Sequence, residues 1–170
     1  MTTLLSHPER KRFPETVKFL TAGSPPPPSL IQRFAEELNV DVTTSYGLTE
    51  TITVITKHKP EPEWFTTNNL TPAERFARCT RQAMDSIAEQ VCVMNPESMT
   101  EVPADGVTVG EVMIKSNSMM KGYFKNPQAT HEAFEHGWFH TGDLAVNHGL
   151  GRFEIKDRSK GNREYDSLHN

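Results

Sequence analysis

Cysteine is scarce in this sequence of 170 residues, which contains only Cys79 and Cys92. Two cysteines at this spacing match neither a zinc-binding motif nor the disulfide framework of a small secreted domain. We therefore expect both thiols to be small core side chains of a protein in a reducing compartment. Such a protein is intracellular, and the sequence does not distinguish the cytoplasm from an organelle.

Long apolar runs and an excess of positive charge are also missing. No run of about 18 apolar residues is present, so the sequence predicts no membrane-spanning helix. A formal net charge of −4 provides no general attraction for nucleic acid or acidic lipid. Near the N-terminus, the basic residues 10–12 stand between Glu9 and Glu15, which favours a solvated loop over a secretory signal or transit peptide. Partners must therefore be sought in local motifs.

The first 90 residues follow a pattern of strand, helix and strand. Residues 16–21 alternate apolar and polar side chains, residues 30–38 place apolar side chains on one helical face, and residues 40–45 are rich in valine and threonine. Ser29 and Gln32 have the spacing of a helix capping box. The four prolines before this helix are interpreted as an extended lead into it, with a polyproline ridge for partner binding as the alternative.

A second helix and then a β-rich region follow. Thr71, Pro72 and Glu74 form a strong helix start, and this helix is expected to run to about Arg81. After about residue 90, short strands are expected at 91–94, 110–116, 137–140, 143–147 and 152–156, with one short helix after residue 126. The predicted fold class is α/β, with an α/β layer over 1–90, a small β-rich subdomain that forms a distorted barrel over 91–160, and a divergent tail over 161–170.

The loop after the second strand carries the first candidate site residues. Thr49 and Glu50 pair a hydroxyl with a carboxylate, next to the flexible Gly47 and the aromatic Tyr46. Glu50 is a candidate ligand of Mg²⁺, which prefers one or two carboxylates together with phosphate oxygens, and Thr49 can donate to a phosphate. Tyr46 is a candidate for stacking on a base. A capped turn after a strand remains the alternative for this short string.

Two charged residues near the C-terminal end carry the second candidate site. Asp143 follows Gly142 at an expected strand start, where a carboxylate can accept hydrogen bonds from two sugar hydroxyls. Arg158 follows an alternating strand, and its guanidinium suits a phosphate or a ribose oxygen. The alternatives are an ordinary turn aspartate and a surface ion pair between Arg158 and Asp157.

Several motifs, taken in order, resemble one enzyme family. The strings are LTAGSPPPP at 20–28, SYGLTET at 45–51, the long segment 102–130, GWFHTGDL at 137–144 and FEIKDRSK at 153–160. Together they resemble the adenylate-forming (AMP-binding) superfamily of acyl-CoA synthetases, adenylation domains and luciferases. RQAMD, VPADG and MKGYFKN are most similar to acyl-activating enzymes of fatty acid metabolism, which act on short or medium-chain carboxylic acids.

The resemblance implies a two-step ligase reaction with ATP, Mg²⁺, coenzyme A and a carboxylic acid as ligands. It implies that the turn Gly23, Ser24 and Pro25 approaches adenine and the acyl pocket, and that Tyr46 lies against the base. Thr49 and Glu50 would hold phosphate and magnesium. The ribose hydroxyls would bind Asp143, Arg158 would bind the ribose or α-phosphate region, and Lys160 would be the hinge of a small C-terminal domain. No nucleic acid is implied, and the oligomeric state is left open.

The sequence also departs from this family. It has no glycine-rich phosphate loop with its lysine, and after Lys160 it reads GNREYDSLHN instead of the family's strand and glycine turn. We therefore expect a fragment of the family's large domain, taken from its C-terminal part. The resulting hypotheses are part of a carboxylate–CoA ligase that is inactive alone, a catalytically inactive module that still binds AMP, and a protein-interaction module.

Overall fold

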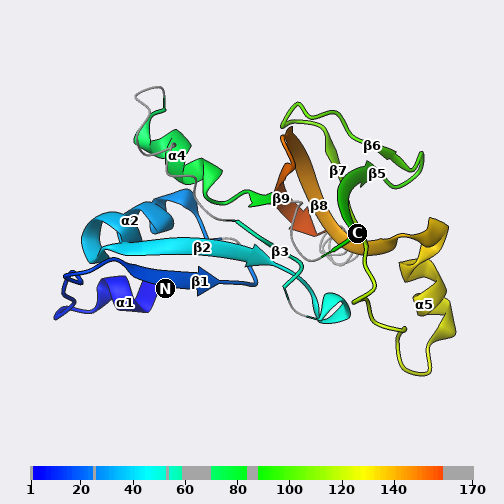
Figure 1. The fold of residues 1–170 in the computed structure, drawn as a ribbon, viewed down its shortest axis with the longest axis horizontal. Coiled ribbons are helices and arrows are strands. Elements are labelled where there is room, and N and C mark those ends of the chain that lie inside the picture. The colour runs from blue at the N-terminus through cyan, green and yellow to red at the C-terminus, as the bar shows by residue number, and fades with distance from the viewer. Residues whose placement is uncertain (1, 25, 53, 59–69, 84–87, 159–170) are drawn as a thin grey trace, which may run out of the picture. The chain divides into compact units, whose positions relative to one another are not determined.

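The computed structural model describes residues 2–24, 26–52, 54–58, 70–83 and 88–158. The chain divides into two compact units. The first consists of Met1–Tyr46 and Lys57–Arg81, and the second of Gly47–Thr56 and Gln82–Asn170. Whereas the sequence-based division kept residues 47–56 with the first 90, the structure groups this loop with the second unit. Figure 1 shows the helices and strands of each unit.

The first unit is built around a β-α-β crossover. Strands β1 (Val17–Thr21) and β2 (Val40–Tyr46) are parallel, with Val17 opposite Val40 and Thr21 opposite Thr44. Helix α2 (Pro28–Leu38) connects them and packs on β2. The short helices α1 (Thr2–Ser6) and α4 (Pro72–Arg78) pack on α2, and β3 (Thr56–Lys57) is the third strand of the sheet order. This arrangement confirms the α/β class.

Helix α2 starts differently from the sequence prediction. Its N-cap is Pro27, no side chain caps it, and Pro28 occupies the first turn. The capping box of Ser29 and Gln32 is therefore wrong. Proline at the start of a helix lacks only a backbone N–H that has no helical partner, and its fixed φ suits the first turn, so a side-chain cap is not required.

Helix α4 starts as predicted. The backbone N–H of Glu74 donates to Thr71 Oγ1 (3.2 Å), and the backbone N–H of Thr71 donates to Glu74 Oε2 (2.7 Å). This reciprocal pair is the predicted capping box. The helix ends at Arg78, three residues earlier than expected, where Cys79 forms its C-cap.

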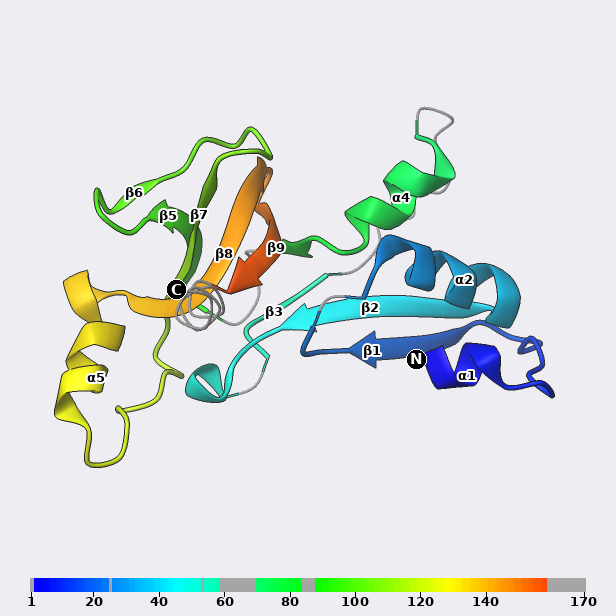
Figure 2. The ribbon, with the colours of Figure 1, turned by 180° about the vertical axis from the view of Figure 1, so that it is seen from behind.

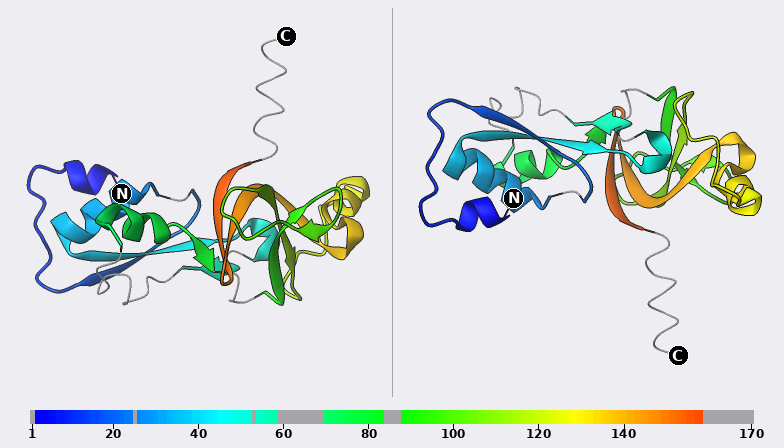
Figure 3. Two further views of the ribbon diagram at one scale, coloured as in Figure 1. Left: turned by 90° about the horizontal axis from the view of Figure 1, so that it is seen from above. Right: turned by 90° about the horizontal axis from the view of Figure 1, so that it is seen from below.

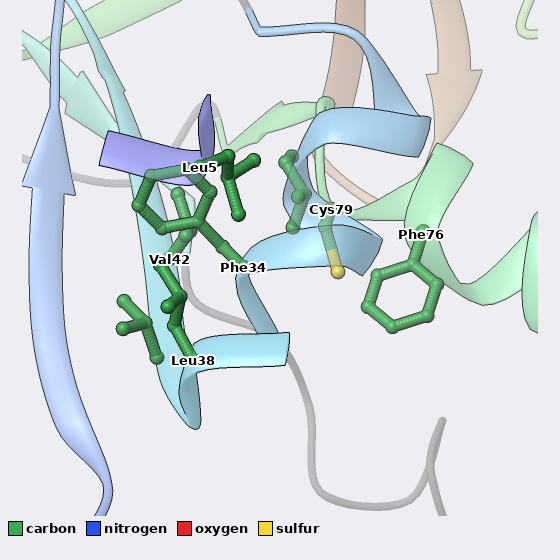
Figure 4. Packing of buried hydrophobic residues seen from close by; sticks show 8 residues of the cluster. Leu5, Phe34, Leu38, Val42, Phe76 and Cys79 are labelled. Carbon is green, nitrogen blue, oxygen red and sulfur yellow. The ribbon is translucent and has the colours of Figure 1, made fainter. Parts of the chain in front are cut away.

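The core of the first unit is apolar and is formed by side chains of α1, α2, β2 and the α4 region. Ile31, Phe34 and Leu38 recur at helical spacing and point inward, which is why this amphipathic segment folds as a helix. Figure 4 shows Phe34, Leu38 and Val42 with side chains from α1 and the α4 region. The cluster consists of Leu5, Ile31, Phe34, Leu38, Val40, Val42, Phe76 and Cys79. Cys79 is thus a core side chain as predicted, whereas Cys92, for which the same was expected, is only partly buried.

The second unit is a six-stranded antiparallel sheet with the order β4-β9-β8-β7-β5-β6. Figure 2 shows its central strands side by side from behind. Within the described residues β4 and β6 are its outer strands and no pairing closes the sheet, so these residues do not confirm the distorted barrel. Its strands are β4 (Gln82–Ala83), β5 (Gln90–Asn95), β6 (Thr100–Glu101), β7 (Val109–Lys115), β8 (Phe139–Gly149) and β9 (Arg152–Arg158).

Strand β8 is the element that positions the site. The sequence predicted two strands, 137–140 and 143–147, but the structure has one continuous strand of 11 residues. Its pairing with β7 is interrupted by a bulge, because Glu111 opposes Leu144 whereas Met113 opposes His140. Figure 3 shows how strongly the β8–β9 hairpin curves. The apparent turn at Gly142 is therefore a bulge inside a strand.

Three short helical elements belong to the described part of the second unit. The 3₁₀ helix η1 (Thr49–Thr51) lies in the loop after β2. Helix α5 (Pro127–Ala133) begins at Asn126, whose side chain accepts the N–H of Ala129, and η2 (Glu135–Gly137) leads into β8. In the described part of the chain, no helix is both long enough and apolar enough to cross a membrane.

Candidate functional site

A cavity lies entirely within the second unit. Its volume is about 1050 Å³. Five parts of the chain line it: the loop 47–50, Glu111 of β7, the segment from Tyr123 through α5, the start of β8, and Arg158 at the end of β9. Polar side chains dominate this lining, so the cavity suits a polar or charged ligand better than an apolar one.

The loop 47–51 is a capped turn that also presents two side chains to the cavity. Thr51 is buried, its hydroxyl donates to the carbonyl oxygen of Leu48 (3.0 Å), and its oxygen accepts the N–H of Leu48 (3.0 Å). These bonds close the turn, so Thr49 and Glu50 are not needed for capping. Thr49 is exposed, and both residues line the cavity.

Glu50 is tied to the segment before α5 by two hydrogen bonds. The Tyr123 hydroxyl donates to Glu50 Oε1 (3.0 Å), and the N–H of Met120 donates to the carbonyl oxygen of Glu50 (2.8 Å). Burial, reinforced by the hydrogen bond to Glu50, raises the pKa of the Tyr123 hydroxyl. Tyr123 therefore stays protonated at neutral pH and restricts the rotamers of Glu50.

Glu50 is also the candidate metal ligand, and its surroundings can be compared with what Mg²⁺ requires. Among the residues that the structure describes, no group of three or more His, Cys, Asp or Glu side chains is arranged to hold a metal ion. Mg²⁺ commonly uses one or two protein carboxylates and takes its other ligands from phosphate and water. The Glu50 carboxylate at a polar cavity fits such a site, because the ligand and water would supply most of the coordination.

The β8 bulge delivers Asp143. Gly142 has φ 72°, a left-handed conformation that glycine adopts without strain. The hydroxyl of Thr141 donates to the carbonyl oxygen of Val112 (2.7 Å), and the N–H of Asp143 donates to Thr141 Oγ1 (3.0 Å). The bulge is thus held by side-chain hydrogen bonds where the regular ladder is interrupted.

Asp143 pairs with Arg158 across the β8–β9 hairpin. The two residues are directly opposite in the register, and Arg158 Nε donates to Asp143 Oδ1 (2.9 Å). The Asp143 side chain is 4% exposed and that of Arg158 is 66% exposed. Arg158 lines the cavity, while Asp143 lies next to the lining residue Gly142. Asp157 accepts the backbone N–H of Arg158 (2.7 Å), so the ion pair that the structure forms is with Asp143.

Glu111 adds a second buried carboxylate to the cavity wall. Its Oε1 accepts the N–H of Gly142 (2.7 Å), and its Oε2 lies 3.1 Å from Nδ1 of His140. Nε2 of His140 lies 3.3 Å from the carbonyl oxygen of Glu135. Both Glu111 and His140 line the cavity.

The structure brings together some of the site residues predicted from the sequence. One cavity is lined by Gly47, Thr49, Glu50 and Arg158. Asp143 is not in the lining but forms an ion pair with Arg158. Gly23, Ser24 and Tyr46 belong to the first unit, where Gly23 (φ 93°) and Ser24 are exposed and Tyr46 is buried at the end of β2. Pro25 and Lys160 lie outside the described residues.

Sequence reasoning missed Glu111, Tyr123 and His140. Glu111 had a usable signal, because it is the one charged residue in the otherwise apolar run at 109–114. Buried carboxylates need hydrogen-bond partners, which indicates a structural or functional role. Tyr123 and His140 lie within the recognised strings, but their partners are 73 and 29 residues away in sequence.

Known proteins with similar sequences identify the family of this chain. Residues 1–124 match the family model of AMP-binding enzymes. The chain is 42% identical over 164 residues to an acetate–CoA ligase of Humulus lupulus and 44% identical over 145 residues to a butyrate–CoA ligase of Arabidopsis thaliana. These alignments cover 94% and 85% of this chain, but only 28% and 25% of the two relatives.

Solved structures agree with the fold. The N-terminal domain of FACL13 from Mycobacterium tuberculosis superposes with a TM-score of 0.67 at 27% identity, covering 92% of this chain and 36% of that one. The family model spans more than two thirds of the residues, and the motifs, the fold and the relatives agree. The chain belongs to the family of AMP-binding enzymes, similar to acyl-activating enzymes.

Proposed function

We propose that this chain carries part of the nucleotide site of an ATP-dependent carboxylate–CoA ligase, as the C-terminal part of its large domain. The main observation behind this proposal is that one polar cavity is lined by Thr49, Glu50 and Arg158 and lies beside Asp143. Arg158 is more than 100 residues away from Thr49 and Glu50 in the sequence. The names of the relatives, acetate–CoA and butyrate–CoA ligase, support this reaction class.

The proposed reaction has two steps. A substrate carboxylate attacks the α-phosphate of ATP, which forms an acyl-adenylate and releases pyrophosphate. The thiol of coenzyme A then attacks the acyl carbon, which forms the thioester and releases AMP. Both steps develop negative charge on phosphate oxygens, so donors and cations fixed around the phosphates would lower the barrier.

Thr49, Glu50 and Arg158 of the cavity, with the neighbouring Asp143, have proposed roles in this reaction. The exposed hydroxyl of Thr49 would donate to a phosphate oxygen, and Glu50, oriented by Tyr123, would hold Mg²⁺. The bound ion would neutralise phosphate charge. Arg158 places its guanidinium at the ribose or α-phosphate while it orients the carboxylate of Asp143 toward the ribose hydroxyls.

The residues of the first unit are proposed to serve adenine and the acyl group. Gly23, Ser24 and Pro25 would approach adenine and the acyl pocket, and Tyr46 would lie against the base. Lys160 is proposed as the hinge between the two half-reactions. The exposure of Gly23 and Ser24 supports their access to a ligand.

The 170 residues alone are proposed to be catalytically inactive. No glycine-rich loop with a lysine is present among them, so the β- and γ-phosphates lack their main anchor. Acyl-dependent exchange of pyrophosphate into ATP, measured with butyrate and hexanoate, is expected to stay at background. Robust exchange would contradict this part of the proposal.

Nucleotide binding has its own test. Calorimetry with AMP is expected to detect binding to the full 170-residue chain and to lose most of the heat in Asp143→Ala. Asp105→Ala, which removes an exposed aspartate of the turn before β7, is the matched control and should bind normally. Binding without exchange would be the behaviour of an inactive AMP-binding module, and unchanged binding by Asp143→Ala would refute the placement of the ribose.

A further inference from the structure

We propose that Glu111 is a positioning residue of the nucleotide site: its carboxylate holds the Gly142 peptide and thereby sets the β8 bulge that aims Asp143 and Arg158. The effect on AMP rests on the proposed function. The effect on the bulge does not, because it follows from contacts within the sheet.

The bulge has more residues than its partner strand can pair. Between the pairs Glu111–Leu144 and Met113–His140, the single residue Val112 on β7 faces Thr141, Gly142 and Asp143 on β8. Two extra residues therefore lie in β8, and their backbone groups need partners outside the regular ladder. Side chains supply them, and Glu111 supplies the partner of Gly142.

The contact between Glu111 and Gly142 has the features of a strong hydrogen bond. The N–O distance is 2.7 Å, and Glu111 is 9% exposed, so little water competes for its oxygens. Hydrogen bonds to a carboxylate are shorter and stronger than those between neutral groups. The second oxygen lies 3.1 Å from His140 Nδ1, which fixes the plane of the carboxylate.

The hydrogen bond from Gly142 to Glu111 affects the site because Gly142 directly precedes Asp143. Because Gly142 is at φ 72° and has no side chain, its peptide can rotate more freely than that of any other residue type. Glu111 restricts this rotation. Asp143 follows directly and is held opposite Arg158 by the β8–β9 register, so the orientation of one peptide is transmitted to the ion pair.

The hydrogen bond can be observed without any ligand. Gly142 is the only glycine in the sequence that follows a threonine, so labelling with carbonyl-¹³C threonine and ¹⁵N glycine selects its amide signal alone. In the full chain this amide proton is expected far downfield. It should move upfield in Glu111→Ala and Glu111→Asp, whose shorter side chain does not reach, and less in Glu111→Gln, which keeps an acceptor oxygen. Glu97→Ala, in the exposed turn between β5 and β6, is the control and should not move it.

The AMP measurement then tests the consequence. Removing a group that orients a metal ligand typically costs about 10- to 100-fold in metal affinity or activity, and we expect an effect of similar size for a group that orients Asp143. Calorimetry should show a loss of this size in Glu111→Ala and near-normal affinity in Glu111→Gln. A merely structural role would not be rescued by the glutamine.

Each outcome separates the two proposals. If the original chain binds no AMP, the proposed function fails, and the Gly142 signal still decides the role of Glu111. An unmoved Gly142 signal in Glu111→Asp overturns the positioning role even where the alanine variant does not fold. Tighter AMP binding by Glu111→Gln would overturn it too, because it would mean that the carboxylate faces the phosphate and repels it.

Discussion

Both units bury apolar side chains, but they differ in the polar side chains that they bury. Under α2 the first unit packs aliphatic and aromatic groups, and its described buried polar residues include no carboxylate: they are Thr44, Ser45, His58 and Thr80. In the second unit two carboxylates, those of Glu111 and Asp143, are buried beside the cavity, each with a hydrogen-bonding partner.

Buried apolar side chains and buried carboxylates contribute differently to the free energy of folding. An apolar core lowers the free energy of folding and requires no particular partner geometry, whereas a buried carboxylate costs free energy unless its partners are in place. The second unit keeps two such carboxylates in a region where the sheet is bulged. Because the second unit also buries apolar side chains such as Val93, Met113 and Phe153, both units have a stabilising core, and we infer that the buried carboxylates of the second unit serve ligand binding.

Phe34→Ala should have the largest effect on stability. Phe34 is 2% exposed, lies in the core of the first unit and has its ring centroid 6.1 Å from that of Phe19. Removing a buried phenyl typically costs about 3–5 kcal/mol in the free energy of unfolding, which urea denaturation would measure. Leu20→Ala, whose parent side chain is 59% exposed, is the control. If both variants lost equal stability, the apolar cluster around Phe34 would not be a stabilising core of the first unit.

Arg158→Met should follow in size. Asp143 would lose the charged donor of its 2.9 Å hydrogen bond while its carboxylate stays buried, at a cost of about 1–3 kcal/mol. Arg33→Met in the first unit removes an exposed ion pair with Glu37 and should change the unfolding free energy much less. Equal effects of the two variants, again in urea, would remove the distinction between buried and exposed carboxylates.

Tyr123→Phe should have a smaller effect that depends on pH. It removes the hydrogen bond to Glu50, which is expected to contribute about 0.5–1.5 kcal/mol. Because the pKa of Tyr123 is raised in the folded chain, the contribution is complete below the unfolded pKa of about 10 and is lost as pH rises through the folded value. Unfolding curves between pH 7 and 11 should therefore converge for the two proteins. A constant difference would contradict the role of the hydroxyl.

Asp105→Asn should have the smallest effect. The hydrogen bonds from the Thr108 hydroxyl and from the backbone N–H groups of Thr108 and Val107 lower the pKa of Asp105 to about 2. Its stabilising contribution is thus present above the unfolded pKa of about 3.9 and disappears as pH falls through 2. The thermal midpoint of the variant should be lower at pH 7 and match that of the original chain near pH 2. A gap that persisted at pH 2 would show another cause.

Local patterns in the sequence were sufficient for much of the fold. The helical spacing of Ile31, Phe34 and Leu38 and the capping box of Thr71 and Glu74 depend on neighbours within a few residues, and both were predicted. The start of α2 was misplaced because proline replaced the expected cap. The bulge in β8 was read as a gap between two strands, because a left-handed glycine in a strand resembles a turn when its partner strand is unknown.

The sequence alone was sufficient to identify the family, because the order and spacing of its motifs can be read directly from the chain. It also carried the chemical identity of Thr49, Glu50, Asp143 and Arg158 as candidate ligand-binding groups. Which of them share a cavity, and that Glu111 and Tyr123 orient them, followed only from the fold. Hydrogen bonds between residues 31 and 73 positions apart depend on strand register and loop packing, and no local pattern encodes those distances.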